Sequence, residues 1–169
     1  TQEWLLVADN FSNVRITDGC KNFFVLSFFS SSCPLFLSIS SISLSAVGIK
    51  SKAFKQLVRD VSSKYIIGLH PSMKSRLSFE WLQKEYNFLS SLAEKKIIHS
   101  RQHYLLLSMP DTYRNLVKIG VENDYSMGYA SQCGFRAGTC FPFLWFDEDR
   151  DICTNLMIHP FQAMDVTFW

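Results

Sequence analysis

The spacing of apolar residues becomes regular after Lys50 and predicts amphipathic helices. A serine at position 78 is a candidate N-cap for the second of them, and Pro110 and Gly120 bracket the third as a start signal and a C-cap. The expected helices lie near residues 52–63, 79–94 and 111–119. Each has an apolar stripe that can face a common core.

Short apolar runs separate these helices and predict strands. "YIIGLH" follows the first helix, "IIHSRQHYLLLS" begins as a strand after the second, and "DYSMGY" follows the third. "CFPFLWFD" and "TNLMIHP" complete the pattern. Helix and strand alternating at short intervals is typical of βα units and a parallel sheet. The expected fold class is therefore α/β with mostly parallel strands.

Residues 1–49 are harder to interpret. No charged residue occurs from Phe23 to Ile49, a length that could cross a bilayer as a helix. Nine serines, Pro34 and the two-residue alternation in "LSISSISLS" favour strands over such a helix. We therefore divide the chain into this hydrophobic, serine-rich segment and an α/β region over residues 50–169, and we do not expect a membrane partner.

Composition, charge and missing motifs exclude several classes of function. The 169 residues are 47% hydrophobic, and the net charge of +2 comes without a Lys/Arg block, so no nucleic-acid partner is expected. Five cysteines without a CxxC pair favour a reducing, cytoplasmic compartment. The chain has no G-x-S-x-G, G-x-G-x-x-G or P-loop motif. Because it begins with Thr1, we expect it to be a segment of a longer protein.

Two of the expected strands end in the same dipeptide, His70-Pro71 and His159-Pro160. Side chains that follow the carboxyl ends of parallel strands gather on one rim of the sheet, where sites are built. Proline fixes the backbone directly after each imidazole. We expect both imidazoles on one rim, where they suit metal ligation or proton transfer. The alternative for either histidine alone is a structural role.

A polar cluster follows the strand that begins at Ile97. Alternation along an extended chain would place Arg101 and His103 on one side, next to Tyr104. An arginine there can orient a carboxylate or donate to a developing oxyanion, although a surface arginine remains the alternative. Asp124 in "NDYSMGY" and Arg136 in "GFRAGT" are further candidates, for a substrate contact or for a structural ion pair.

Four blocks, "GLHPS", "RQHYLLLSMPDTYRNLVKIGVENDYSMGYA", "GFRAGTCFPF" and "NLMIHPFQAMD", together resemble the C-terminal portion of polysaccharide-deacetylase-like proteins. These bacterial proteins are related to the NodB-type carbohydrate esterases, and the resemblance covers about residues 50–169. It implies a partial or distorted (β/α) barrel that removes N- or O-acetyl groups from a saccharide substrate. It also implies a divalent metal, often zinc, held by one aspartate and two histidines.

The resemblance assigns roles to three residues. His70 matches the first metal-binding histidine, Arg101 matches an arginine that supports the catalytic carboxylate, and His159 matches the general acid for the leaving group. The expected substrate-binding residues are His103, Tyr104, Asp124 and Arg136.

The sequence departs from the family pattern in the metal site. Lys74 stands where the family has its second metal-binding histidine, and no paired aspartates precede His70. A catalytic zinc requires three protein ligands. The sequence therefore predicts a deacetylase site that this chain alone leaves incomplete. The alternative is a non-catalytic domain of the same fold that binds saccharide or serves structure, and the sequence indicates neither the sugar nor the oligomeric state.

Overall fold

The structure, a computed structural model, describes residues 5–9, 13–17, 23–27, 35–38, 52–164 and 167. Three helices occur among them, α2 (Lys52–Lys64), α3 (Phe79–Ala93) and α4 (Asp111–Ile119). The strands are β1 (Leu5–Asp9), β2 (Asn13–Thr17), β3 (Phe23–Ser27), β4 (Leu35–Ser38), β5 (Ile67–His70), β6 (His99–Ser100), β7 (Asn123–Asp124), β8 (Phe143–Asp147) and β9 (Ile152–Ile158). The three helices confirm the predicted ones to within a residue or two.

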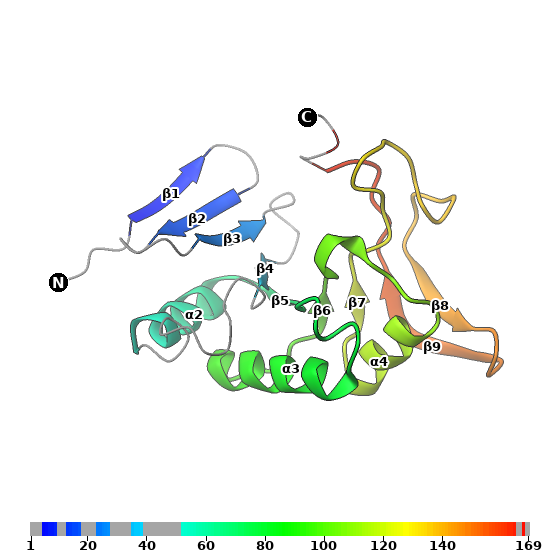
Figure 1. Ribbon diagram of the computed structural model, residues 1–169, viewed down its shortest axis with the longest axis horizontal. Helices are drawn as coiled ribbons and strands as arrows, with labels where there is room; N and C mark the ends of the chain where they lie inside the picture. Colours follow the sequence, from blue (N-terminus) through cyan, green and yellow to red (C-terminus); the bar gives the residue numbers. More distant parts are fainter. Residues whose placement is uncertain are drawn as a thin grey trace.

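The described strands form one mixed sheet in the order β1-β2-β3-β4-β5-β6-β7-β9-β8 (Figure 1). The pairs from β4 through β5, β6 and β7 to β9 are parallel. The pairs among β1 to β4 are antiparallel, as is the pair of β8 with β9. The predicted α/β class with a mostly parallel central sheet is confirmed. Among the described strands the sheet is open, with β1 and β8 at its two ends.

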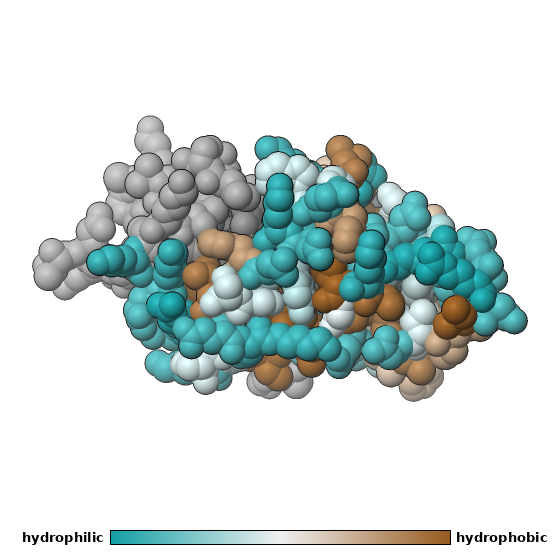
Figure 2. All heavy atoms as spheres, turned by 90° about the horizontal axis from the view of Figure 1, so that it is seen from below, coloured by the Kyte–Doolittle hydropathy of each residue, from teal (hydrophilic) through white to brown (hydrophobic). Residues whose placement is uncertain are grey.

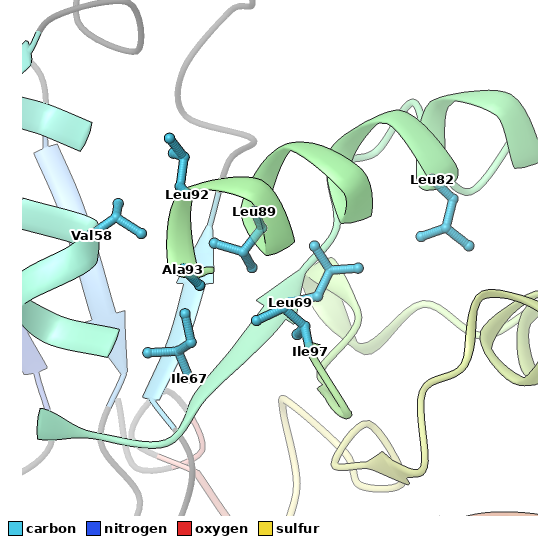
Figure 3. Close-up of a cluster of buried hydrophobic side chains, with 8 residues drawn as sticks. All are labelled: Val58, Ile67, Leu69, Leu82, Leu89, Leu92, Ala93 and Ile97. Carbon is cyan, nitrogen blue, oxygen red and sulfur yellow. The ribbon is translucent and has the colours of Figure 1, made fainter. Parts of the chain in front are cut away.

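The core lies between the helices and one face of the central strands (Figure 1). One cluster joins α2, α3 and β5 (Figure 3) and consists of Val58, Ile67, Leu69, Leu82, Leu89, Leu92, Ala93 and Ile97. A second joins α4 to β8 and β9 and consists of Tyr113, Leu116, Val121, Trp145, Leu156 and Ile158. Burial of each large aliphatic side chain contributes about 1.5–3 kcal/mol.

Local signals explain where the helices begin and end. Ser78 has extended backbone angles, and its hydroxyl oxygen accepts a hydrogen bond from the amide of Trp81 at the start of α3. Gly120 ends α4 with a positive φ of 87°, a conformation in which glycine is unstrained. Figure 2 shows the molecule from the side on which the helices lie in Figure 1, where hydrophilic residues surround smaller hydrophobic patches.

Parts of the sequence prediction need correction or fall outside the described residues. β3 and β4 lie within the charge-free stretch, as the strand interpretation expected, but the alternation after Ser38 lies outside the described residues. Tyr65 and Ile66 are exposed, so the buried strand starts only at Ile67. None of the helices in the described ranges is long and apolar enough to cross a membrane.

A buried carboxylate fixes the chain directly after β5. Pro71 is fully buried, and the next residue, Ser72, donates its backbone amide to Oε2 of Glu85 at 2.9 Å. The Ser72 hydroxyl donates to the other oxygen, Oε1. Glu85 lies on the buried side of α3. The helix therefore holds the turn that follows His70, and the position of that imidazole depends on α3.

We predict that Glu85→Ala destabilises the fold, because it leaves the half-buried amide of Ser72 without its acceptor. Hydrogen bonds to a charged group contribute about 1.5–3 kcal/mol, so the free energy of unfolding should fall by about 2–3 kcal/mol. Urea unfolding followed by circular dichroism measures this change. Gln83→Ala, at an exposed position of the same helix, is the matched control. Equal stability of the two variants would show that Glu85 does not hold the turn.

Candidate functional site

Polar side chains gather where the parallel strands end. His70 is the last residue of β5, Arg101 follows β6, and His159 follows β9. The backbone amides of Arg101 and His159 donate to the carbonyls of Leu69 and Asp124, so hydrogen bonding between neighbours continues one residue past the strands. The prediction that His70 and His159 lie at strand ends on one rim is confirmed.

His70 and His103 form a hydrogen-bonded imidazole pair. Nδ1 of His70 lies 2.7 Å from the carbonyl oxygen of Arg101, and Nε2 of His70 lies 3.0 Å from Nδ1 of His103. A carbonyl oxygen can only accept, so Nδ1 of His70 carries the proton. Nε2 of neutral His70 then has a lone pair, and Nδ1 of His103 donates to it. We call these two residues the His70 pair.

Burial keeps His70 uncharged. It lowers the pKa of His70 to about 4, and the neighbouring charges of His103 and Arg101 act in the same direction, while the hydrogen bond to the Arg101 carbonyl opposes them. Burial also lowers the pKa of His103. At neutral pH both rings are therefore in the form that has a free nitrogen lone pair, which is the form that binds metal ions.

A strained turn delivers His103 to this position. Tyr104 and Leu105 both have a φ of 54°, in the left-handed region, which costs a non-glycine residue about 1–3 kcal/mol. The amide of Leu106 donates to the carbonyl of His103, and Nη1 of Arg136 donates to the carbonyl of Leu105 at 3.0 Å. Arg136 thus holds the turn that carries His103. The side chain of Tyr104 is 72% exposed and its ring packs against His103.

Arg101 is buried, with only 5% of its surface exposed. Its guanidinium lies over the ring of Phe161, 4.7 Å from the centroid. The same ring packs so closely on Gly128 that a Cβ atom there would lie 2.3 Å from it. The glycine in "SMGY" is therefore required by this stack. The guanidinium of Arg101 packs on Phe161, and the imidazole of His103 is directed toward His70.

Asp124 lies fully buried beneath the rim. Its carboxylate accepts hydrogen bonds from the hydroxyl of Ser100 at 2.7 Å and from the amide and hydroxyl of Ser126 at 2.9 and 2.8 Å. The hydroxyl of Ser126 also accepts from the amide of Gln102, which ties the end of β6 to the end of β7. Burial raises the pKa of Asp124, and these hydrogen bonds oppose the rise. In this position Asp124 supports the rim from below.

His159 belongs to a separate group of side chains, which we call the His159 cluster: His99, Asn123, Tyr125 and His159. Nε2 of His159 donates to the amide oxygen of Asn123 at 2.8 Å, and its ring stacks on Tyr125 with centroids 4.4 Å apart. Burial lowers the pKa of His159, and burial together with the charge of His159 lowers that of His99. Instead of the carboxylate neighbour that a general acid calls for, the neutral Asn123 is bonded to Nε2.

Sequence reasoning missed His99, Asn123 and Tyr125. Strand alternation could have identified them. His99 and Asn123 precede the buried Ser100 and Asp124 in β6 and β7, and Tyr125 directly follows β7, so all three face the other side of the sheet. Strands β6 and β7 separate β5 from β9. Three strand spacings of about 4.8 Å place His70 and His159 about 14 Å apart along the rim. The rim thus has two groups of side chains.

The described residues supply two neighbouring metal-binding groups at this rim. Among them, no three His, Cys, Asp or Glu side chains lie together in a way that could hold a metal ion. Lys74, at the position of the expected second histidine, has its ammonium 5.5 Å from the ring centroid of Trp81. A metal ion here would therefore have the His70 pair as its ligands from the described part of the chain.

Comparison of the chain with models of protein families, with curated proteins and with solved structures finds no match. A functional assignment therefore depends on the residues of this chain and their geometry.

We predict that the metal-free protein loses stability as the pH falls from about 6.5 toward 4. The pKa of His70 is about 4 in the folded protein and 6.5 in an unperturbed histidine, so over this range the unfolded chain takes up a proton that the folded chain refuses. The loss attributable to His70 approaches about 3 kcal/mol. Urea unfolding in EDTA at several pH values measures it.

The matched control is His70→Asn, which keeps a donor for the Arg101 carbonyl but cannot take up a proton. Its stability should depend less steeply on pH. The remaining slope combines the other three histidines, whose pKa values are also lowered, with Asp124, whose raised pKa acts in the opposite direction. Identical slopes for the two proteins would contradict the neutral, buried state of His70.

Proposed function

We propose that this chain forms part of a carbohydrate-deacetylase-like hydrolase domain that removes N- or O-acetyl groups from a saccharide with the help of a divalent metal, zinc in the first place. In this proposal the open sheet is one part of a distorted (β/α) barrel of the polysaccharide deacetylase type. The observation that carries the proposal is the His70 pair. Its first imidazole has Nδ1 bound to a backbone carbonyl and Nε2 unprotonated, the arrangement that orients histidine ligands of metal ions.

His70 would bind the metal through Nε2. A divalent metal held there supplies a lowered pKa for a bound water and polarisation of an acyl carbonyl. The family pattern adds an aspartate ligand and an aspartate base, and Asp124 is too deeply buried for either role. In this proposal those carboxylates come from a part of the protein outside the described residues.

The remaining rim residues bind and orient the substrate or move protons. The guanidinium of Arg101 is held rigidly on Phe161 and supports a carboxylate near the reacting group. Nε2 of His159 is held by Asn123, which leaves Nδ1 to take up a proton and to pass it to the leaving amine or alkoxide. The exposed ring of Tyr104 offers a flat apolar surface to a sugar ring.

The distance between the two histidines sets a condition on this proposal. Residues about 14 Å apart along a flat rim cannot act on one acetyl group. In a barrel, side chains on the inner face of the sheet converge toward the axis. Strand alternation places His99, Asn123 and His159 on the face opposite the buried Ser100, Asp124 and Ile158. The helices lie on the buried side, so the opposite face is the inner face of such a barrel. Curvature of the complete sheet would bring the two groups together.

A non-catalytic saccharide-binding or structural domain of the same fold is the second candidate. Lys74 favours it, because its ammonium lies against Trp81 and cannot replace an imidazole ligand. Under this alternative the exposed Tyr104 still binds saccharide, but the protein has no hydrolytic activity. Saccharide binding without acetate release in the presence of zinc would favour this second candidate.

We predict that the zinc-loaded full-length protein, which in this proposal supplies the two carboxylates, releases acetate from an N-acetylated oligosaccharide. In it His159→Ala should lower turnover about 10²–10⁴-fold, the usual contribution of general acid catalysis. Zinc content should stay unchanged, because His159 is not a ligand in this proposal. Asn155→Ala, at an exposed position of β9, the strand that precedes His159, is the control and should keep full turnover. Unchanged turnover of His159→Ala would mean that His159 is structural.

A further inference from the structure

We infer that His103 is the second imidazole ligand of the metal site, in place of the histidine that position 74 lacks. This inference rests on the proposed function, since it names a ligand of the same site. It assigns the site a class of ion, a divalent transition metal that prefers nitrogen ligands. His103 comes from the turn after β6, whereas position 74 belongs to the loop after β5.

The separation of the two nitrogens suits a shared ion. Nε2 of His70 and Nδ1 of His103 are 3.0 Å apart and face each other. Two imidazole nitrogens that bind one zinc ion at about 2.0–2.1 Å, in tetrahedral geometry, lie about 3.3 Å apart. To convert the hydrogen bond into a metal bridge, the two nitrogens must separate by a few tenths of an ångström, and each ring must turn by roughly 35° so that its lone pair points at the ion. Rotation about the side-chain bonds of the two histidines can make this adjustment without a change of the backbone.

The protons also balance. Without metal, Nδ1 of His103 carries the proton that it donates to His70. With metal, that nitrogen needs its lone pair, so the proton leaves Nδ1 and a proton binds Nε2 of the same ring through solvent. His103 is half-buried, so part of its surface is exposed to solvent. Both rings stay neutral before and after, and His70 keeps its own proton on Nδ1, bound to the carbonyl of Arg101.

The surrounding residues hold His103 in place. The left-handed angles of Tyr104 and Leu105 bend the chain back toward β5, and the hydrogen bond from Arg136 to the Leu105 carbonyl fixes that bend. Strained backbone of this kind persists where the surrounding structure enforces it, and it clusters at functional sites. Meanwhile the ammonium of Lys74 lies over Trp81 and so does not compete for the space beside His70.

The donor set indicates which ions bind. Imidazole nitrogen suits zinc, cobalt, nickel and copper, whereas magnesium and calcium require oxygen ligands. Two imidazoles with no carboxylate beside them in the described residues therefore favour zinc over magnesium or calcium. The remaining coordination positions would be open to water or to a substrate oxygen.

The test is a zinc titration of the full chain after EDTA treatment and dialysis, in competition with a chromophoric chelator. We expect one zinc ion per chain and no displacement of it by a large excess of magnesium. His70→Ala and His103→Ala should each weaken zinc binding by at least about 10–100-fold, the range seen when even an outer partner of a ligand is lost. His99→Ala removes an imidazole outside the His70 pair and is the control. Its zinc affinity should stay within about twofold of that of the unsubstituted protein, well below the 10–100-fold loss expected for a ligand.

Folding of each variant is checked by circular dichroism, and His103→Gln is used if His103→Ala does not fold. Unchanged zinc affinity in the folded His103 variant would overturn the inference while leaving His70 as a ligand. The absence of zinc binding to the unsubstituted protein would overturn it as well.

Acetate release separates this inference from the proposed function. If the His70 pair binds zinc but no acetate appears, the ligand assignment stands and the deacetylase proposal fails. If acetate appears and the His103 variant keeps its zinc affinity, the function stands and the ligand assignment fails.

Discussion

The hydrogen bond from Nδ1 of His70 to the carbonyl of Arg101 is the interaction on which the candidate site depends. The amide of the same arginine donates to the carbonyl of Leu69, so one residue of the chain after β6 is joined to two consecutive residues of β5. This pairing fixes the orientation of the imidazole and the nitrogen that carries its proton. The lone pair on Nε2, and the approach of His103 to it, follow from that one bond.

The position of the rim follows from which face of the sheet is buried. Leu69, Ser100, Asp124 and Ile158 lie side by side across β5, β6, β7 and β9, and all are fully buried on the helix-covered side. Their sequence neighbours must therefore face the opposite side. Because these strands are parallel, their carboxyl ends, and the polar residues there, lie together at one rim of the sheet. Asp124 holds this edge together, since it accepts hydrogen bonds from β6 and from the residue two positions after itself.

Much of this arrangement could be predicted from the sequence, and the limits have physical reasons. Helical periodicity located all three described helices, and the apolar runs that end in His-Pro placed His70 and His159 on one rim. The His70 pair was not predictable, because it depends on the left-handed turn after His103. Nothing local in "HYLL" favours such a turn; a distant residue, Arg136, stabilises it. The burial of Asp124 was not predictable either, because it depends on a hydrogen bond from Ser100, which is 24 positions away in the sequence.

The most direct test of this account is the protonation state of His70 in the metal-free protein. Long-range ¹H–¹⁵N correlation spectra of ¹⁵N-histidine-labelled protein at pH 7 distinguish the two neutral tautomers and the charged ring. The structure predicts that His70 is neutral with its proton on Nδ1 and stays so down to a pH near 4. A His70 ring that is charged at pH 7, or that carries its proton on Nε2, would contradict the account.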